Sequence, residues 1–349
     1  MAELPTTFKE YIRIIGRGQR AGRTLTEEEA FAAMGMLIRK DCTPEQRGAF
    51  LMLLRVREET PEEIAGFVRA FRQHNLAGLD SLGIDLDMGC YAGKRRHLPW
   101  FILAALCLAQ TGRKVFMHGT QEPESQRLYL DHVLPELGMP VASNLEQAKQ
   151  ALKSWNICYM PLSQVNPALE EVIQLRALFG LRSCANTLAR MLNPSKAEHS
   201  LQGVFHKEVD NKHQHAAALL DEANALCFRG EGGELEINPE RPATLCISRH
   251  GQLSTVEVPA LLTTWQTKSK ILDAGQLVDF WTGDDDSLYA QQAVVGTLAI
   301  MLVLTDKCEW LQAYEQAQRL WQQRNRQWPF SLDLAQHIDF STTGIISPH

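Results

Sequence analysis

The sequence contains no pair of cysteines at the Cys-x-x-Cys spacing. Its eight cysteines are scattered along the chain, at Cys42, Cys90, Cys107, Cys158, Cys184, Cys227, Cys246 and Cys308. Zinc ribbons need paired cysteines and small secreted domains need a disulfide framework, so this pattern indicates neither class. We expect the cysteines to be reduced and mostly buried.

The sequence also lacks a long hydrophobic run. Its longest apolar stretch, AVVGTLAIMLVL, is shorter than the roughly 20 residues that a membrane span needs. The N-terminal segment MAELPTTFKEYIRII lacks the cationic start, the continuous apolar stretch and the small-residue cleavage site of a signal peptide. We therefore expect a cytoplasmic protein that makes no contact with a membrane.

Positive charge is scarce, because 35 lysines and arginines face 41 acidic residues and the net charge is −6. This total weighs against a polyanionic partner, which needs a local excess of bases. The bases are clustered, however, and residues 176–215 carry six bases against three acids. With 349 residues and 45% hydrophobic content, the chain is long enough for one large domain or two smaller ones.

Helix starts dominate the first 75 residues. Thr26, Thr43 and Thr60 each stand three residues before Glu or Gln, and a proline follows two of them. This pattern is typical of a capping box, in which the threonine and the later side chain satisfy each other's backbone donors. Apolar residues at three-to-four spacing follow each start, which predicts a small bundle of amphipathic helices.

Short apolar stretches alternate with helical ones from about residue 84, as in KVFMHG and ICYMPL. Such alternation predicts an α/β fold with a mostly parallel central sheet. Long helices return at 163–194, and we expect them to pack back on the N-terminal bundle. The predicted organisation is a small discontinuous helical domain (1–78 with 163–194), a larger α/β domain (79–162 and 195–326) and an unassigned tail (327–349).

Several segments resemble the anthranilate phosphoribosyltransferase family, which has the glycosyltransferase family 3 fold. The run LTEEEAFAAMGMLI with its continuation looks like that family's helical domain. RALFGLRSCANTLARMLNP is similar to its Arg-x-x-Leu-Gly-x-Arg-Thr-x-x-Asn helix pair and is the most specific match. The resemblance extends from about residue 8 to residue 325. It implies a nucleoside phosphorylase/phosphoribosyltransferase-like fold and a homodimer.

The segments that carry the family's chemistry are altered. The Gly-Thr-Gly-Gly-Asp pyrophosphate loop reads GCYAG at 89–93, so side chains stand where the backbone should be bare. The Lys-His-Gly-Asn-Arg segment reads MHGTQ at 117–121 and has lost both cations. The family has an adjacent Asp-Glu pair that binds magnesium in this segment. Here Glu231, Glu234 and Glu236 remain, but no two acidic residues are adjacent.

The resemblance leaves a relic of a substrate pocket. Its predicted members are Gly89, His118, Gly119, Asn166 and Arg182. Arg182, and Arg176 beside it, have an alternative structural interpretation as a buried salt bridge or a helix cap. We expect no metal and no other cofactor, and magnesium would be needed only if the chain were a transferase.

The altered loop is followed by a run of cations. The predicted phosphate- and nucleic-acid-binding residues are Tyr91, Gly93, Lys94, Arg95, Arg96, His97, Lys207 and Lys212. A solvated charge run is the alternative. Cations at a helix start are disfavoured by about 0.3 to 1 kcal/mol, which favours a partner anion there. Tyr91 would stack on an unpaired base.

The loop resembles that of a divergent, YbiB-type branch of the family, which implies a homodimer that binds DNA or RNA with little sequence specificity. The main prediction is therefore a protein that has lost catalysis and binds nucleic acid through a basic groove. The first alternative is an active phosphoribosyl or glycosyl transferase with an altered substrate. The second alternative is a protein-interaction scaffold.

Overall fold

The computed structural model describes residues 4–18, 21–123, 125–264 and 272–331. Four helices form the N-terminal region, namely α1 (Phe8–Gly16), α2 (Glu27–Ile38), α3 (Pro44–Arg57) and α4 (Pro61–Arg72). Thr26, Thr43 and Thr60 each accept a hydrogen bond from the backbone N–H three residues later. The side chain at that later position bonds back to the cap, so the three predicted helix starts are confirmed.

A seven-stranded sheet forms the larger domain, in the order β3-β2-β1-β4-β5-β6-β7. The strands are β1 (Leu86–Cys90), β2 (Val115–Gly119), β3 (Ile157–Pro161), β4 (His199–Val204), β5 (Asn224–Arg229), β6 (Ala243–Arg249) and β7 (Gln252–Val258). β1 to β5 pair in parallel, and β6 and β7 are antiparallel. The predicted mostly parallel sheet is confirmed.

Helices connect and cover these strands. They are η1 (Leu79–Leu82), α5 (Phe101–Ala109), α6 (Leu130–Glu136), α7 (Leu145–Trp155), α12 (Val209–Leu219), η2 (Glu231–Gly233), α13 (Gly275–Thr282), α14 (Leu288–Thr305) and α15 (Trp310–Gln323). Among the described residues, α14 is the helix long and apolar enough to cross a membrane, but 78% of it is buried inside the protein. Packing against α5 and α15 accounts for its apolar character. The cytoplasmic location stays a prediction.

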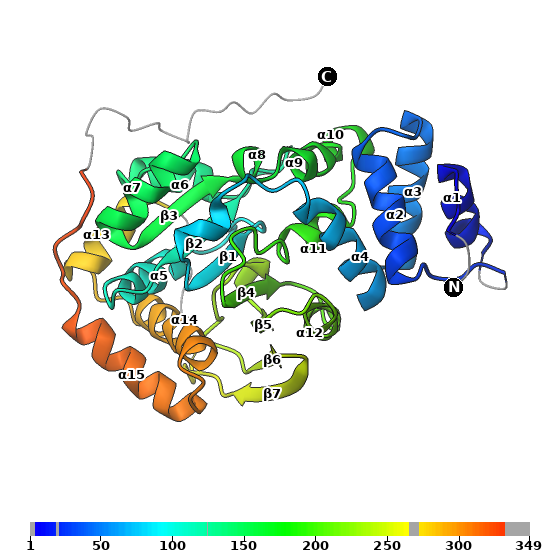
Figure 1. Cartoon of the computed structure of the whole chain (residues 1–349). Coiled ribbons are helices and arrows are strands. Elements are labelled where there is room, and N and C mark those ends of the chain that lie inside the picture. Colours follow the sequence, from blue (N-terminus) through cyan, green and yellow to red (C-terminus); the bar gives the residue numbers. More distant parts are fainter. Residues whose placement is uncertain (1–3, 19–20, 124, 265–271, 332–349) are drawn as a thin grey trace, which may run out of the picture.

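The chain returns to the N-terminal helices after β3. This segment forms α8 (Leu162–Val165), α9 (Pro167–Gln174), α10 (Arg176–Phe179) and α11 (Ala185–Ala189). α9 and α11 pack on each other, α11 contacts α4, and their buried side chains share one hydrophobic cluster with those of the N-terminal helices. Figure 1 shows these helices beside α2 and α4, at the end of the molecule away from α15. The fold is a small helical domain beside a larger α/β domain.

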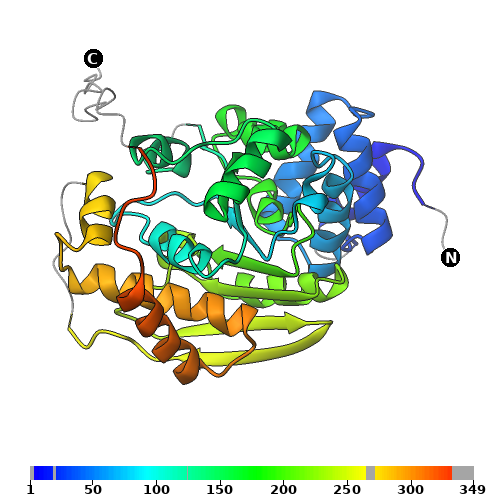
Figure 2. The same ribbon diagram turned by 60° about the vertical axis from the view of Figure 1, so that its left-hand side comes forward.

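The C-terminal helices lie on the far side of the α/β domain from the helical domain, as the turned view in Figure 2 shows. The described start of the predicted tail packs on this domain, since the Trp328 indole N–H donates to the Leu137 carbonyl at 2.9 Å. The rest of that tail, from residue 332, lies outside the described residues.

The order of the strands indicates where a ligand-binding site should lie in this sheet. β1 lies between β2 and β4, so the connection from β1 leads to one side and β4 begins the other half of the sheet. In open α/β sheets, ligands bind at the carboxyl ends of strands where the order reverses in this way. The segments that leave β1 and β4 are residues 91–97 and 205–208, and both belong to the region that the sequence singled out.

Candidate functional site

Close packing and backbone conformation explain the glycines in the altered loop and in the neighbouring strand β2. A Cβ on Gly119 would lie 2.3 Å from the Cys90 carbonyl oxygen, so β1 and β2 approach each other too closely there for any side chain. Gly93 has φ +68°, and a Cβ there would lie 2.9 Å from the Tyr129 ring. Gly89 lies within β1, against the backbone of Arg190. These glycines are therefore explained by packing.

The backbone donors of the loop are already occupied. The N–H groups of Ala92 and Gly93 donate to one carboxylate oxygen of Glu234, at 2.7 and 2.5 Å. Burial raises the pKa of this carboxyl, and the hydrogen bond from Gly93 opposes the rise. The donors that would reach a pyrophosphate therefore hold an internal carboxylate instead.

Lys94 points into the protein and not toward solvent. Its side chain is 1% exposed, and the ammonium lies 2.6 Å from Glu236 and 2.9 Å from Glu231. Burial alone lowers the pKa of Lys94, but the two carboxylates outweigh this and raise it. Burial also raises the pKa of Glu236 to about 7, and Lys94 opposes that rise. The prediction that Lys94 faces an external phosphate is wrong, because its charge is neutralised inside.

These acidic residues do not fit a magnesium ion. The Lys94 ammonium occupies the space between Glu231 and Glu236 with its own positive charge. Glu236 accepts a further hydrogen bond, from the Phe101 N–H at the start of α5. No group of three or more metal-ligating side chains occurs in the part of the chain that the structure describes. A divalent cation needs several carboxylate oxygens directed at one point, whereas here Lys94 already holds Glu231 and Glu236.

Tyr91 and His118 form a buried polar chain beneath the loop. The Tyr91 hydroxyl is hydrogen-bonded to Nδ1 of His118, and Nε2 of that ring lies 3.1 Å from Asp87. Tyr91 is 1% exposed and His118 is fully buried. The prediction that Tyr91 stacks on a base is wrong, because its ring is enclosed. Three predicted pocket residues, Gly89, His118 and Gly119, are likewise core residues that line neither cavity described below.

Asn166 is a helix cap. Its side-chain oxygen accepts from the Leu169 N–H at 2.9 Å and so caps α9, and Pro167 follows at the first helical position. Its amide donates to the Phe71 carbonyl and to Asn75, both at 2.7 Å. Asn166 is fully buried, so its predicted place in a substrate pocket is wrong.

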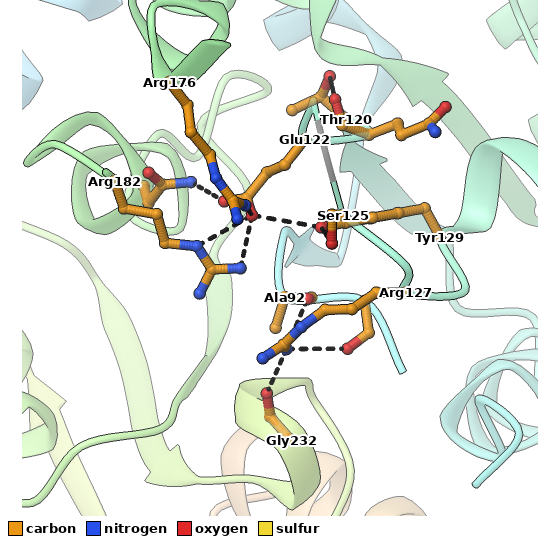
Figure 3. Close-up of polar contacts among 12 residues, drawn as sticks. Ala92, Thr120, Glu122, Ser125, Arg127, Tyr129, Arg176, Arg182 and Gly232 are labelled. Carbon is orange, nitrogen blue, oxygen red and sulfur yellow. Dashed lines mark hydrogen bonds and ion pairs between the residues drawn. The ribbon is translucent and has the colours of Figure 1, made fainter. Parts of the chain in front are cut away.

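Glu122 is a residue that the sequence analysis did not identify. Its carboxylate forms an ion pair with Arg182, the arginine predicted to line the substrate pocket. Figure 3 shows its carboxylate surrounded by the side chains of Arg176 and Arg182. Two nitrogens of Arg182 donate to one oxygen at 2.9 and 2.5 Å, and Asn186 donates to the other. Glu122 comes from the segment after β2, whereas both arginines belong to the returning helices, so the ion pair joins the two domains. Both arginines therefore form salt bridges, as their structural alternative predicted, but the bridges join the two domains and the arginine side chains are only partly buried.

Two cavities adjoin each other, one of about 650 Å³ between the two domains and one of about 400 Å³ within the α/β domain. Arg127, Phe205 and Gly232 line both, and we call the two together the cationic cleft. Its ten basic side chains are Arg55, Arg95, Arg96, Arg127, Arg182, Arg190, Lys207, Lys212, Arg229 and Arg241, and its three acidic ones are Glu58, Glu59 and Glu231. The cleft is therefore strongly positive in a chain whose net charge is −6.

The bases of the cleft differ in availability. Arg95 and Arg96 are exposed, and neither makes a hydrogen bond or ion pair with another described residue. Lys207 is 79% exposed with Glu208 at 3.7 Å, and Lys212 is paired with Glu58 at 2.7 Å. These four predicted cations line the cleft.

Arg127 is the base that the two cavities share. Its guanidinium donates to the carbonyls of Ala92, Gly93 and Gly232 at 2.9 to 3.3 Å, and Figure 3 shows it lying across the loop. His97 does not line the cleft, because its ring stacks on Tyr289 with centroids 4.1 Å apart. The prediction that His97 belongs to the phosphate-binding run is therefore wrong for this structure.

Solved structures share the whole fold. Anthranilate phosphoribosyltransferase from Thermus thermophilus superposes with a TM-score of 0.72 at 22% identity, covering 90% of this chain and 93% of that one. The enzyme from Saccharomyces cerevisiae, in a complex with PRPP and Mg, superposes with a TM-score of 0.69 at 16% identity and the same coverage. At these identities the likeness establishes the fold.

Sequence relatives establish the family. Residues 9–75 match the helical bundle domain of a glycosyl transferase family, and residues 102–269 match its a/b domain. Anthranilate phosphoribosyltransferase of Halalkalibacterium halodurans is 30% identical over 240 residues, which are 68% of either chain. That of Oleidesulfovibrio alaskensis is 31% identical over 240 residues, 68% of this chain and 72% of the relative. The chain belongs to the glycosyltransferase family that includes the anthranilate phosphoribosyltransferases.

Proposed function

We propose that this chain is a member of the family that has lost phosphoribosyl transfer and binds DNA or RNA, with little sequence preference, in the cationic cleft. The observation that carries the proposal is the excess of ten bases over three acids in the cleft of an otherwise acidic chain. Phosphate contacts supply affinity that does not depend on sequence. Exposed, unpaired Arg95 and Arg96 are the strongest candidates for such contacts.

Internal charges occupy the three places where transfer chemistry would need a ligand. Glu234 holds the loop N–H groups, Lys94 fills the space between two carboxylates, and Glu122 neutralises Arg182. Transfer depends on preorganised charges that meet the transition state, and losing a single donor typically costs about 3 to 4 kcal/mol. Three occupied places together argue against turnover.

The net charge of −6 opposes long-range attraction of a polyanion. Screening limits this effect to a Debye length of about 8 to 10 Å at ordinary salt, so the local bases dominate close to the cleft. Each phosphate that a base neutralises on duplex DNA contributes about 0.9 to the slope of log affinity against log salt. Binding should therefore weaken steeply as salt rises.

A polarisation titration at two salt concentrations tests the proposal. The variant carries Arg95→Ala and Arg96→Ala, and the matched control carries Lys149→Ala and Lys153→Ala on α7, which removes the same charge from exposed positions outside the cleft. We expect the cleft variant to bind more weakly and with a lower salt slope, and the control to bind as the wild type does. Equal binding by all three proteins, or none at low salt, contradicts the proposal.

The second candidate is an active phosphoribosyl or glycosyl transferase with an altered substrate. The comparisons favour it over nucleic-acid binding, because the similar proteins are named as anthranilate phosphoribosyltransferases. Arg182 lines the larger cavity and keeps one feature of the substrate pocket. Calorimetry with phosphoribosyl pyrophosphate and magnesium separates the candidates. Micromolar, magnesium-dependent binding supports the transferase, whereas no heat supports the main proposal.

We also propose that the chain is a homodimer that associates through apolar faces of its N-terminal helices, which would present two cationic clefts. Size-exclusion chromatography with light scattering tests this, and a monomer at micromolar concentration contradicts it. A protein-interaction scaffold is the remaining alternative. Recovery of a stoichiometric protein partner from a nuclease-treated lysate, together with no binding in the polarisation titration, would favour it.

A further inference from the structure

Phe205 is an apolar ring placed among charges. Its side chain is 63% exposed, and among the described residues it is the one aromatic side chain that belongs to the exposed class. It follows β4 directly and lines both cavities of the cationic cleft. A single exposed apolar side chain is common on protein surfaces, so the position of this ring among cations, rather than its exposure, is what suggests a ligand.

The backbone around Phe205 leaves the ring open. A Cβ on Gly233 would lie 3.1 Å from the Cβ of Phe205 and 3.4 Å from that of Ala92, and Gly233 has φ +89°. The glycine turn of η2 thus packs against the base of the side chain and adds no side chain of its own beside the ring. The His206 ring lies perpendicular to that of Phe205, with centroids 5.1 Å apart and planes at 89°. A perpendicular contact leaves a face of the Phe205 ring available.

Cations flank the ring on both sides. The smaller cavity adds Arg95, Arg96 and Arg229, and the larger one adds Lys207 and Lys212. The residues next to Phe205 in the chain, 206–208, are exposed and polar, so the ring is not part of a wider apolar patch that a protein or a membrane would cover. A single flat apolar face between positive charges matches a nucleobase between phosphates.

We infer that Phe205 is a stacking platform for an unpaired base and that the cationic cleft therefore binds single-stranded nucleic acid in preference to duplex. The inference rests on the proposed function and specifies its substrate. In a duplex each base already stacks on its neighbours and is paired, so the ring gains nothing and only the cations act. In a single strand the base turns onto the ring while its phosphates reach Arg95 and Arg96 on one side and Lys207 on the other.

The test compares a labelled oligothymidine of about 20 nucleotides, a length that spans one or two such sites, with a duplex of equal length. The variants are Phe205→Leu, which keeps an apolar side chain and removes the ring, and Phe205→Trp, which keeps a ring. Leu253→Ala on β7 is the matched control, since it trims another exposed apolar side chain outside the cleft.

We expect the Phe205→Leu variant to lose about 5- to 150-fold in affinity for the single strand, the range that base–aromatic stacking provides. Its affinity for duplex should stay within about twofold of the wild type, because phosphate contacts are unchanged. The Phe205→Trp variant and the Leu253→Ala control should bind both forms as the wild type does. Thermal unfolding of each variant confirms that the fold is intact.

The outcomes separate the inference from the proposed function. If Phe205→Leu binds both nucleic acids as the wild type does, or loses equally for both, the inference is wrong, while a loss in the Arg95→Ala, Arg96→Ala variant still supports the cleft. If the wild type binds neither form at low salt, the proposed function fails and the inference fails with it. A loss confined to the single strand and restored by tryptophan supports the inference.

Discussion

Lys94 and its neighbours Arg95 and Arg96 follow one another in the chain and have opposite environments. Lys94 is enclosed and neutralised by Glu231 and Glu236, whereas the two arginines are exposed at the cleft and have no hydrogen-bond or ion-pair partner among the described residues. The comparison separates two kinds of positive charge. Buried cations with internal carboxylates hold the altered loop together, and exposed cations remain available to a ligand.

The cations that line the larger cavity of the cationic cleft also divide into internally paired and available ones. Arg182 points toward the larger cavity but is held by Glu122, and Lys207 is 79% exposed. A count of bases therefore overstates the charge that a ligand can reach. The available set is smaller and lies around Phe205, on both sides of the place where the sheet order reverses.

Among the substitutions that test the contrast between buried and exposed cations, Lys94→Ala should lower the unfolding free energy most. It leaves the fully buried Glu236 carboxylate beside Glu231, which is 12% exposed, without a cation, and breaking a buried pair in this way costs about 3 to 5 kcal/mol of unfolding free energy. Denaturant unfolding measures the loss. Arg95→Ala is the neighbouring control and should change stability by less than about 0.5 kcal/mol. Equal effects of the two substitutions would show that Lys94 is not a structural cation.

A second test of the contrast between buried and exposed groups uses the effect of pH on the unfolding free energy through the buried His213. Burial lowers the pKa of His213 from 6.5 to about 3, and its Nε2 has no hydrogen-bond partner among the described residues. Because the folded pKa lies below the unfolded one, stability is full above pH 6.5 and falls as the pH drops toward 3. Between pH 6.5 and pH 4 this group should account for a loss of about 3 kcal/mol.

The matched variants for this pH effect are His213→Asn and His215→Asn, on the same helix. His215 is exposed, so its replacement should leave the fall in stability unchanged, whereas His213→Asn should flatten it after any uniform loss is subtracted. Unfolding free energies at pH 6.5, 5 and 4 provide the measurement. A parallel fall in both variants would contradict the assignment.

Glu122→Gln has a smaller expected effect. The substitution removes the charge that Arg176 and Arg182 share, and both arginines are partly exposed, at 23% and 31%, so water compensates in part. We expect a loss of about 1 to 3 kcal/mol. Glu171→Gln, which removes the charge that Lys40 and Arg47 share at a glutamate that is 45% exposed, should cost less than about 1 kcal/mol. Similar losses in both variants would remove the distinction between the interdomain and the surface pair.

Removing the available cations should affect stability least. Its effect should appear instead in the salt dependence of nucleic-acid binding. The Arg95→Ala, Arg96→Ala variant should lower the slope of log affinity against log salt by about 1.8 for each chain on duplex DNA, since each phosphate contributes about 0.9. Its unfolding free energy should stay within about 0.5 kcal/mol of the wild type. An unchanged slope would mean that these arginines do not contact phosphate.

Local rules in the sequence predicted the helix starts and the parallel strands, because capping and periodicity act over a few residues. Asn166 was readable by the same rules, since Asn followed by Pro is a helix start, but the resemblance directed attention to a pocket. Lys94 was not readable, because Glu231 and Glu236 lie more than 130 residues further along the chain and their approach depends on the whole sheet.

Two further residues show the same limit. Glu122 has no distinctive spacing in the sequence, and its role follows only when the returning helices bring Arg176 and Arg182 to it. Phe205 directly follows β4, in which every residue is buried, and therefore looks like a core residue. Its exposure depends on where the strand ends, which a sequence pattern locates only to within a few residues.

The carboxylate of Glu234 acts on the loop as a permanently tethered ligand. A group attached to the same chain reaches its site at an effective concentration of about millimolar or more, so a free anion must exceed that level to displace it. Ligands stabilise a fold only when they bind the native state, by an amount that grows with their concentration over the dissociation constant. Inorganic phosphate at low millimolar concentration should therefore not displace Glu234 from the loop, which stays complete in the absence of any substrate.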